Sequence, residues 1–182
     1  MRKILGAYFF QKSAVAAASR LLGKFIVRKI GTKTVALMLT ETEAYDGFND
    51  KASHAHRGKT ARNAPMFGAS GHWYVYFTYG MHWLINIVTG PENYPAAVLL
   101  RGCVYYKNGK EVSINGPARL AKFLKITGKF SGKKADKKTG LWIEDRGVRT
   151  SPRLIKKSPR VGVGYAGKWA KKEYRFYIKD VV

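Results

Sequence analysis

The sequence predicts an α+β fold, in which a single domain holds a curved, mostly antiparallel, open-barrel-like sheet and a few peripheral helices. Segments rich in β-branched and aromatic residues recur along the 182 residues, whereas segments with helical periodicity are few and short. The strand segments lack the regular alternation with helices that builds a parallel sheet. No internal repeat and no linker rich in Pro, Gly or Ser divides the chain, so we expect one domain over residues 1–182.

The amino-terminal part of the chain predicts a helix followed by a hairpin. Residues 13–22 are typical of a short helix, because Ser13 can cap its first turn and Gly23 can end it in the left-handed conformation. The segments 24–30 and 33–40 are rich in β-branched residues, and the Gly-Thr pair between them favours a tight turn.

The carboxyl-terminal part predicts a second helix, a loop and further strands. A proline at the first position and apolar residues at helical spacing predict a helix over 117–127, which Gly128 ends. Residues 125–139 carry six lysines and one acid, and this pattern predicts a mobile, solvated loop. Residues 153–182 alternate basic and apolar side chains, which indicates strands with a short turn near Trp169.

The charge balance points to a polyanionic partner. The chain has 34 Lys and Arg against 11 Asp and Glu, a formal net charge of +23. Nucleic acid is the first candidate partner and an anionic membrane surface is the second. A basic surface that serves only solubility is the third interpretation. The 46% hydrophobic content excludes a disordered chain.

Cysteine usage and the amino terminus indicate an intracellular protein. Cys103 is the only cysteine, so the chain can form neither an intramolecular disulfide nor a cysteine-rich metal site. The apolar run at the start stops at Gln11, too early for a secretory signal. No apolar stretch has transmembrane length, so we expect no membrane insertion.

An acidic cluster is the first candidate site. The chain has no acid before Glu41, and then Glu41, Glu43, Asp46 and Asp50 fall within ten residues. In a strand, Glu41, Glu43 and Tyr45 point to one side. A partly desolvated carboxylate beside an aromatic ring can act as a general base, because its pKa is raised. Spacing alone leaves open an ordinary solvated strand face.

An aromatic hairpin over residues 71–83 is the second candidate site. Six of these thirteen residues are Trp, Tyr or Phe, and the turn is predicted near Tyr79-Gly80. One face carries Tyr74, Tyr76 and Thr78, and the other, predicted to be core, carries Val75 and Phe77. An exposed aromatic residue at a turn tip suits a wedge that enters a base stack, although plain packing stays open for Tyr79.

A basic loop over residues 54–63 is the third candidate site. Three cations of this loop, Arg57, Lys59 and Arg62, suit contacts with phosphates. The alternative is a charged loop that is only solvated. His54 and His56 stand near Asp50, but no third ligand follows at a familiar spacing, so we predict no metal site.

A glycine-rich segment over residues 161–167 superficially resembles a dinucleotide fingerprint. It lacks the full glycine spacing, a βαβ unit and a following acid, so we reject a nucleotide cofactor there. Close backbone approach to a ligand and plain turn chemistry both remain open.

Together, these residues resemble the signature blocks of the alkyladenine DNA glycosylases, also called 3-methyladenine DNA glycosylases. The resemblance covers over half of the chain, and the combination of blocks is far more specific than any one of them. The matching segments are residues 39–102, 113–120 and 158–177.

The resemblance implies a monofunctional enzyme that flips damaged purines out of double-stranded DNA and hydrolyses their N-glycosyl bond. Implied substrates are 3-methyladenine, 7-methylguanine, hypoxanthine and ethenoadenine. Glu43 matches the glutamate that activates the attacking water, and Arg101 an arginine that helps to hold this water. Tyr79 matches the intercalating tyrosine. No cofactor is required, and we expect a monomer.

The resemblance also implies the residues of the base pocket. Tyr45, His54 and Tyr76 match the residues that sandwich the flipped base. Asn86 matches an asparagine that disfavours the amino group of guanine, and Val161 a backbone contact near the flipped nucleotide. Arg62 matches an arginine in the loop that follows the pocket histidine.

Two other functions remain possible from the sequence. The first is a non-catalytic nucleic-acid-binding domain, similar to the domain with which tRNA formyltransferases grip tRNA. The second is a basic ribosome-associated protein. Neither would need the set of Glu43, Tyr45, Tyr79 and Arg101.

Overall fold

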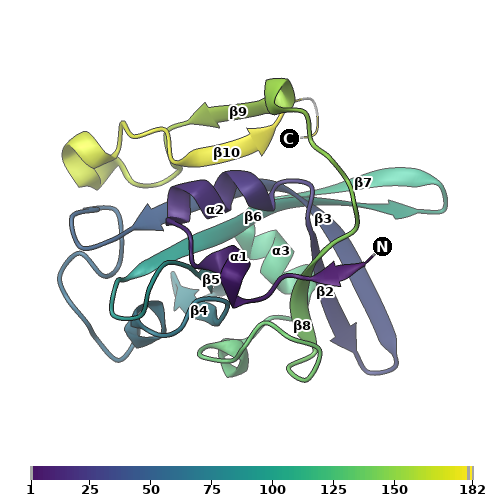
Figure 1. Cartoon of the computed structure of the whole chain (residues 1–182), viewed down its shortest axis with the longest axis horizontal. Helices are drawn as coiled ribbons and strands as arrows, with labels where there is room; N and C mark the ends of the chain where they lie inside the picture. Colours follow the sequence, from purple (N-terminus) through teal and green to yellow (C-terminus); the bar gives the residue numbers. More distant parts are fainter. Residues whose placement is uncertain (1, 180, 182) are drawn as a thin grey trace.

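The computed structural model describes residues 2–179 and 181 and confirms the predicted α+β architecture (Figure 1). Within these residues, ten strands form one sheet, and all strand pairings are antiparallel. The strands are β1 (Lys3–Ile4), β2 (Phe25–Ile30), β3 (Lys33–Asp46), β4 (Trp73–Thr78), β5 (His82–Val88), β6 (Ala96–Lys107), β7 (Lys110–Asn115), β8 (Leu141–Asp145), β9 (Ile155–Ser158) and β10 (Arg175–Ile178).

Short helices surround this sheet. The α-helices of the described residues are α1 (Ala7–Phe10), α2 (Ala14–Leu21) and α3 (Pro117–Phe123), and the 3₁₀ turns are η1 (Ala64–Phe67), η2 (Gly128–Phe130), η3 (Pro152–Leu154) and η4 (Gly164–Trp169). None of the helices formed by residues 2–179 and 181 has the length and apolarity needed to cross a membrane.

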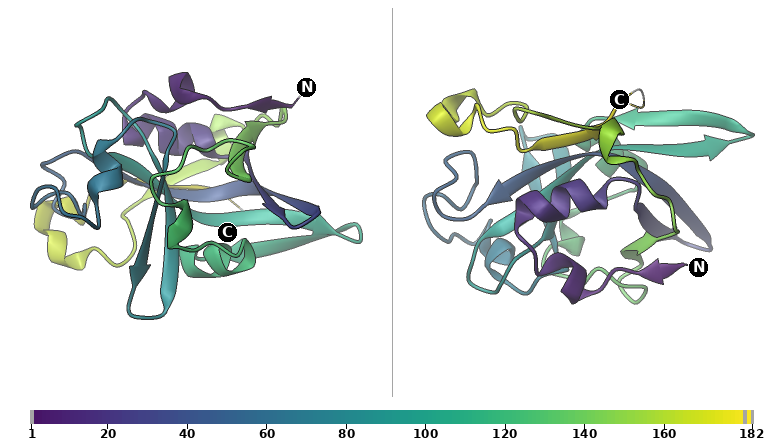
Figure 2. Two further views of the ribbon diagram at one scale, coloured as in Figure 1. Left: turned by 90° about the horizontal axis from the view of Figure 1, so that it is seen from below. Right: turned by 45° about the horizontal axis from the view of Figure 1, so that its top comes forward.

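The sheet is strongly curved. Its main path runs β1-β8-β2-β3-β6-β5-β4, while β10 pairs with β3 and β9, and β7 pairs with β6. In the left view of Figure 2, the β4–β5 hairpin runs almost across the direction of β6 and β7. The hairpin therefore projects from the body of the molecule, and this matters for the site below.

The amino-terminal elements form as predicted. The Ser13 hydroxyl caps α2 by accepting a hydrogen bond from the Ala16 N–H, and Gly23 follows the helix with φ of 79°. The predicted hairpin joins β2 and β3, with Ile30 paired to Lys33. β3 is longer than its predicted segment and continues to Asp46. This extension places Glu41, Glu43 and Asp46 of the acidic cluster in the sheet, whereas Asp50 follows the strand.

The alanine-rich face of α2 packs against β3. Its buried residues are Ala14, Ala17, Ala18 and Leu21. Their small side chains let the helix approach closely enough for the Thr42 hydroxyl to donate to the Ala18 carbonyl at 3.0 Å. The adjoining core includes Phe10, Leu37 and Trp73, all fully buried.

Two predictions in the carboxyl-terminal half are wrong. The second helix, α3, ends at Phe123 rather than at Thr127, because the chain leaves the helix through Lys125, whose φ is 52°. Residues 125–139 do not form a solvated loop. Ile126, Phe130 and Ala135 are buried, so apolar residues between the lysines anchor this segment in the core.

The same segment covers the outer edge of β4. The Trp73 N–H donates to the Lys133 carbonyl and the Gly132 N–H to the Trp73 carbonyl, both at 2.8 Å. The Val75 N–H donates to the Ser131 hydroxyl at 3.2 Å. These bonds satisfy backbone groups that an edge strand otherwise leaves open.

The predicted core face of β4 is only partly buried. Val75 lies in the core as expected, but Phe77 is 44% exposed, since the hairpin projects beyond the body at this point. The predicted carboxyl-terminal strands are confirmed as β9 and β10, with η4 and Trp169 between them.

A bulge in β3 shapes the sheet where the acidic cluster lies. The pairing of β3 with β6 shifts register on either side of Glu41, opposite Gly102. A Cβ atom at Gly102 would lie 2.9 Å from the Cβ of Glu41, so only glycine fits this close approach.

Candidate active site

A pocket of about 380 Å³ opens beside the ends of β3, β4 and β5. The structure brings eight of the predicted site residues together in its lining. They are Glu43, Tyr45, His54, Tyr76, Tyr79, Asn86, Arg101 and Val161. They come from β3, the loop after it, the β4–β5 hairpin, β6 and the segment before η4, so the fold assembles a set that is dispersed in the sequence.

Glu43, rather than Glu41, is the carboxylate of this pocket. Both side chains are buried, which excludes the solvated strand face that spacing had left open. Glu41 lies outside the pocket lining, and its Oε1 accepts from Arg101 Nε at 2.9 Å and from Arg175 Nε at 2.5 Å. Two cations thus neutralise Glu41, whereas Glu43 faces the cavity.

Two hydrogen bonds and a nearby cation orient the Glu43 carboxylate. The Val161 N–H donates to Oε1 and the Tyr45 hydroxyl to Oε2, both at 2.8 Å. The Nε of Arg101 lies 3.5 Å from Oε1. The carboxylate is therefore held in one orientation at the pocket wall, as a group that must position water requires.

Burial dominates the protonation of Glu43. Loss of hydration raises the pKa of this carboxyl above its ordinary value, and the nearby charge of Glu41 adds to the effect. Arg101, the Val161 N–H and the Tyr45 hydroxyl act in the opposite direction without cancelling it. A carboxylate with a raised pKa is a stronger base than an exposed glutamate.

An aromatic cluster forms another wall. The rings of His54 and Tyr76 meet edge to face with centroids 4.5 Å apart. The Nδ1 of His54 lies 2.9 Å from the Tyr74 hydroxyl, and burial raises the pKa of Tyr74 to about 12, so this hydroxyl stays protonated. Partial loss of hydration and the charge of Arg62 lower the pKa of His54, which favours the neutral imidazole.

Asn86 lies on β5 at the base of the pocket and is 3% exposed. Its Nδ2 donates to the Tyr74 carbonyl at 3.1 Å, across the β4–β5 pair. The amide is therefore fixed in orientation, which is a requirement for a group that discriminates between base edges.

Tyr79 occupies the tip of the β4–β5 hairpin. Its side chain is 85% exposed, and its φ of 52° is a left-handed conformation that Gly, Asn or Asp usually adopts. Gly80 follows with φ of 64°. An aromatic residue that keeps a strained turn position and buries almost nothing indicates a role for its side chain outside the fold.

The three predicted phosphate contacts lie outside the pocket lining. Arg57, Lys59 and Arg62 are all exposed. Arg62 packs over the Tyr76 ring at 5.1 Å and donates to the Phe77 carbonyl at 3.0 Å, so its cation stands beside the hairpin. Lys59 lies over the Phe67 ring at 5.6 Å.

Sequence reasoning missed a buried ion pair behind the pocket. Asp50 and Arg160 are fully buried and form two hydrogen bonds, and Arg160 also donates to the Ala44 carbonyl at 2.8 Å. Two features of the sequence could have indicated this pair: Asp50 is the one acid of the cluster that lies outside the strand, and Arg160 directly precedes Val161. Tyr165, also missed, lines the pocket.

No metal chemistry is indicated by the described part of the chain. Within residues 2–179 and 181, no three His, Cys, Asp or Glu side chains gather closely enough to hold a metal ion. Asp50, the carboxylate nearest His54 and His56 in the sequence, is engaged by Arg160.

A buried, oriented carboxylate in a cavity of a strongly basic protein fits the class of enzymes that act on nucleic acid. Comparisons with known proteins agree. The family model for methylpurine-DNA glycosylase matches residues 8–181. The chain therefore belongs to the methylpurine-DNA glycosylase family, and it is a DNA glycosylase, a hydrolase of N-glycosyl bonds in DNA.

Curated relatives match over nearly the whole chain. A relative from Methanocella arvoryzae is 39% identical to this chain, and the matched region spans 97% of this chain and 93% of the relative. One from Legionella pneumophila (strain Paris) is 38% identical, and the matched region spans 99% of this chain and 96% of the relative. One from Streptomyces avermitilis is 40% identical, and the matched region spans 94% of this chain and 86% of the relative. Each is named "Putative 3-methyladenine DNA glycosylase". Membership of an enzyme family speaks against the two non-catalytic alternatives.

Proposed function

We propose that the protein flips damaged purine nucleotides out of duplex DNA and hydrolyses their glycosidic bond with a water activated by Glu43. The observation that carries this proposal is the Glu43 carboxylate itself, which is fully buried, faces the pocket and is oriented by two hydrogen bonds and the nearby Arg101 cation. Extrusion is needed because a base stacked in a duplex cannot reach such a site, and it is easiest for damaged or mispaired bases.

The reaction proceeds at C1′ of the flipped nucleotide. As the bond to the base nitrogen breaks, the sugar gains positive charge, which the Glu43 carboxylate stabilises. Glu43 takes a proton from the water that attacks C1′, and the base leaves with the bonding electrons. Arg101 Nε lies 3.5 Å from Glu43 Oε1, where it holds the carboxylate and helps to place the water.

The aromatic walls select the base. Tyr45 and Tyr76, with His54, form a slot into which a planar ring can stack, and an electron-poor alkylated purine stacks well on electron-rich rings. Asn86, fixed by its bond to Tyr74, disfavours the exocyclic amino group of guanine. Val161 adds a backbone contact at the rim, where its side chain is exposed.

Substrates follow from the leaving group. 3-Methyladenine, which the names of the relatives contain, and 7-methylguanine leave readily because alkylation has made the base cationic. Hypoxanthine and ethenoadenine are neutral and need a proton. His54 is a poor source of it, since its lowered pKa favours the neutral form, so its function is stacking and hydrogen bonding.

Tyr79 fills the space that the flipped nucleotide leaves, while the basic surface holds the bent backbone. Arg57, Lys59 and Arg62 contact phosphates beside the pocket.

The decisive experiment compares Glu43→Gln with wild type on duplexes that carry one 7-methylguanine or one hypoxanthine. Single-turnover base release should fall by about a thousand-fold, within the roughly 10²–10⁴ that a general base contributes, while duplex binding persists. Glu41→Gln is the matched control, because Glu41 is buried two residues away but lies outside the pocket lining. Base release by Glu43→Gln at the wild-type rate would refute the assignment.

A further inference from the structure

We propose that the face of the β4–β5 hairpin opposite the base pocket is a second DNA-contact surface, which holds the strand opposite the lesion. The inference rests on the proposed function, since it takes Tyr79 as a wedge inserted into the duplex. It adds a surface for the undamaged strand, built from Phe77, Trp83 and three lysines, of which Lys122 lies in the last turn of α3 and Lys125 and Lys129 in the segment that follows.

The hairpin has two different faces. Tyr74 and Tyr76 point into the base pocket, whereas Phe77 and Trp83 lie on the other face, with ring centroids 4.7 Å apart. Phe77 is 44% exposed and Trp83 is partly exposed. Trp83 packs partly against the core, so the fold leaves this pair of aromatic rings partly covered and partly open to solvent.

Trp83 stands between two shallow grooves. One, of about 480 Å³, is lined by Phe77, Trp83 and Arg62 among others. The other, of about 420 Å³, is lined by Trp83, Lys122 and Lys125 among others. Neither groove has an acidic side chain among the described residues that line it. Among the described residues that line the two grooves, the Lys and Arg side chains are Arg62, Lys122 and Lys125, so the charge beside the aromatic rings is positive.

The lysines are placed by the fold and are not a random charge run. Lys122 lies in the last turn of α3, and Lys125 takes a left-handed conformation at φ of 52° just after the helix. Lys129 follows Gly128, at which a Cβ atom would lie 2.8 Å from the Trp83 ring. The left view of Figure 2 shows α3 and η2 on one side of the projecting hairpin and the loop after β3, with η4, on the other.

A nucleic acid strand is the partner that fits this surface. Cations without acids attract phosphates, and exposed aromatic rings accept bases by stacking. A wedge that displaces one nucleotide leaves its partner base unpaired on the opposite strand. With the lesion strand on the pocket face, the opposite strand must pass the other face, where Phe77 and Trp83 can receive that unpaired base.

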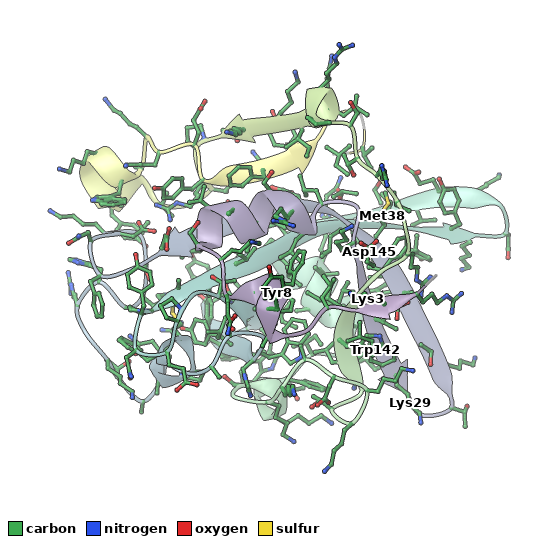
Figure 3. All side chains as sticks on the ribbon, viewed as in Figure 1. Lys3, Tyr8, Lys29, Met38, Trp142 and Asp145 are labelled. Carbon is green, nitrogen blue, oxygen red and sulfur yellow. The ribbon has the colours of Figure 1, made fainter. Side chains whose placement is uncertain are left out.

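The first test measures binding and its salt dependence. The triple variant Lys122→Gln/Lys125→Gln/Lys129→Gln is compared with Lys33→Gln/Lys107→Gln/Lys110→Gln, which removes the same charge from exposed positions of the β2–β3 and β6–β7 hairpins. Figure 3 shows Lys29, beside the turn of the β2–β3 hairpin, on the other side of the molecule from β4. Both sets are built on Glu43→Gln, so that a hypoxanthine duplex stays uncut.

The first triple variant should bind the duplex at least tenfold more weakly and lose about 2–3 from the slope of log K against log salt, since each lost phosphate contact removes about 0.9. Binding of the lesion strand alone should change less than twofold. The proposal is overturned if the control triple loses as much slope, or if single-strand and duplex binding fall equally. Neither outcome depends on base release, so both are separate from a failure of Glu43 as the base.

The second test concerns the unpaired base. On the Glu43→Gln background, duplexes with a thymine or an abasic site opposite hypoxanthine should differ in affinity at least threefold, and the difference should vanish when Phe77→Ser/Trp83→Ser is added. Trp83 fluorescence should be quenched by the thymine duplex, and Trp83→Phe identifies its signal. An unquenched Trp83 together with an unchanged affinity difference would overturn the proposal and assign the rings to a protein partner or to folding.

Discussion

Arg160 and Asp50 lie 110 residues apart in the chain and form a bidentate ion pair in which neither side chain is exposed. Arg160 also packs over the Tyr45 ring at 4.7 Å and donates to the Ala44 carbonyl. The next residue, Val161, donates its N–H to Glu43. The pair therefore fixes the segment whose Val161 N–H orients the Glu43 carboxylate.

Asp50→Asn should destabilise the protein by about 3–5 kcal/mol, because it leaves the Arg160 charge buried without its partner. Urea unfolding at pH 7 measures this loss. Asp50→Leu/Arg160→Met removes both charges and should recover part of the stability, as replacement of a whole buried pair often does. A double variant no more stable than Asp50→Asn would show that the pair acts through shape and not through charge.

Arg101→Gln should move the acidic limb of the pH–rate profile to higher pH. Base release requires the ionised Glu43, so the rate rises as pH passes the pKa of this carboxyl. Arg101 lowers that pKa, and its removal therefore raises it further above the ordinary value of 4.5. Single-turnover rates on a 7-methylguanine duplex between pH 4.5 and 8.5 measure the shift, since this cationic base needs no added proton.

The wild-type limb should already lie above pH 4.5 because burial raises the pKa of Glu43. Arg175→Gln is the matched control, since Arg175 pairs with Glu41 and lies outside the pocket lining. Equal shifts in both variants would indicate a general charge effect and not the contact of Arg101 with Glu43.

The local features of this site are visible in the sequence, whereas the contacts that complete it are not. Alternation along a strand places Glu43 and Tyr45 on one face, and a Tyr-Gly turn places Tyr79 at a tip, because both depend on neighbouring residues. Val161 reaches Glu43 across 118 residues of chain, and no periodicity encodes such a contact. The resemblance to a family supplied that residue.

The lysine-rich segment shows a different limit. Six lysines in residues 125–139 predict a solvated loop, yet Ile126 and Phe130 anchor it in the core. The lysine content correctly predicts exposed side chains. It does not predict that the backbone at Gly132 and Lys133 forms hydrogen bonds with the edge of β4. Such pairing depends on which strand has an open edge, and this is known only once the sheet is formed.

Tyr79→Asn should stabilise the fold while weakening lesion recognition. Tyr79 holds a left-handed turn conformation at φ of 52° that asparagine adopts more easily, so the free energy of unfolding should rise by roughly 0.5–1 kcal/mol. Loss of the wedge should weaken binding of a hypoxanthine duplex at least tenfold and leave binding of undamaged duplex within twofold. Thermal unfolding and fluorescence anisotropy measure the two effects. If both affinities stay at their wild-type values, Tyr79 is not a wedge.

Glu43→Gln should change stability with pH in a direction that the raised pKa determines. The neutral carboxyl suits its buried position, so its contribution to stability is complete below the unfolded pKa, near 4.5, and is lost as pH rises through the raised folded pKa. Wild type should therefore lose stability relative to Glu43→Gln between those two pKa values, and the difference should stay constant at higher pH. Urea unfolding of both proteins at pH 4, 5.5, 7 and 8 measures it. Glu41→Gln should instead destabilise at pH 7, since it leaves Arg175 without its carboxylate. A difference between wild type and Glu43→Gln that is independent of pH, or that grows toward acid, would show that Glu43 is not held in the pocket at the cost of stability.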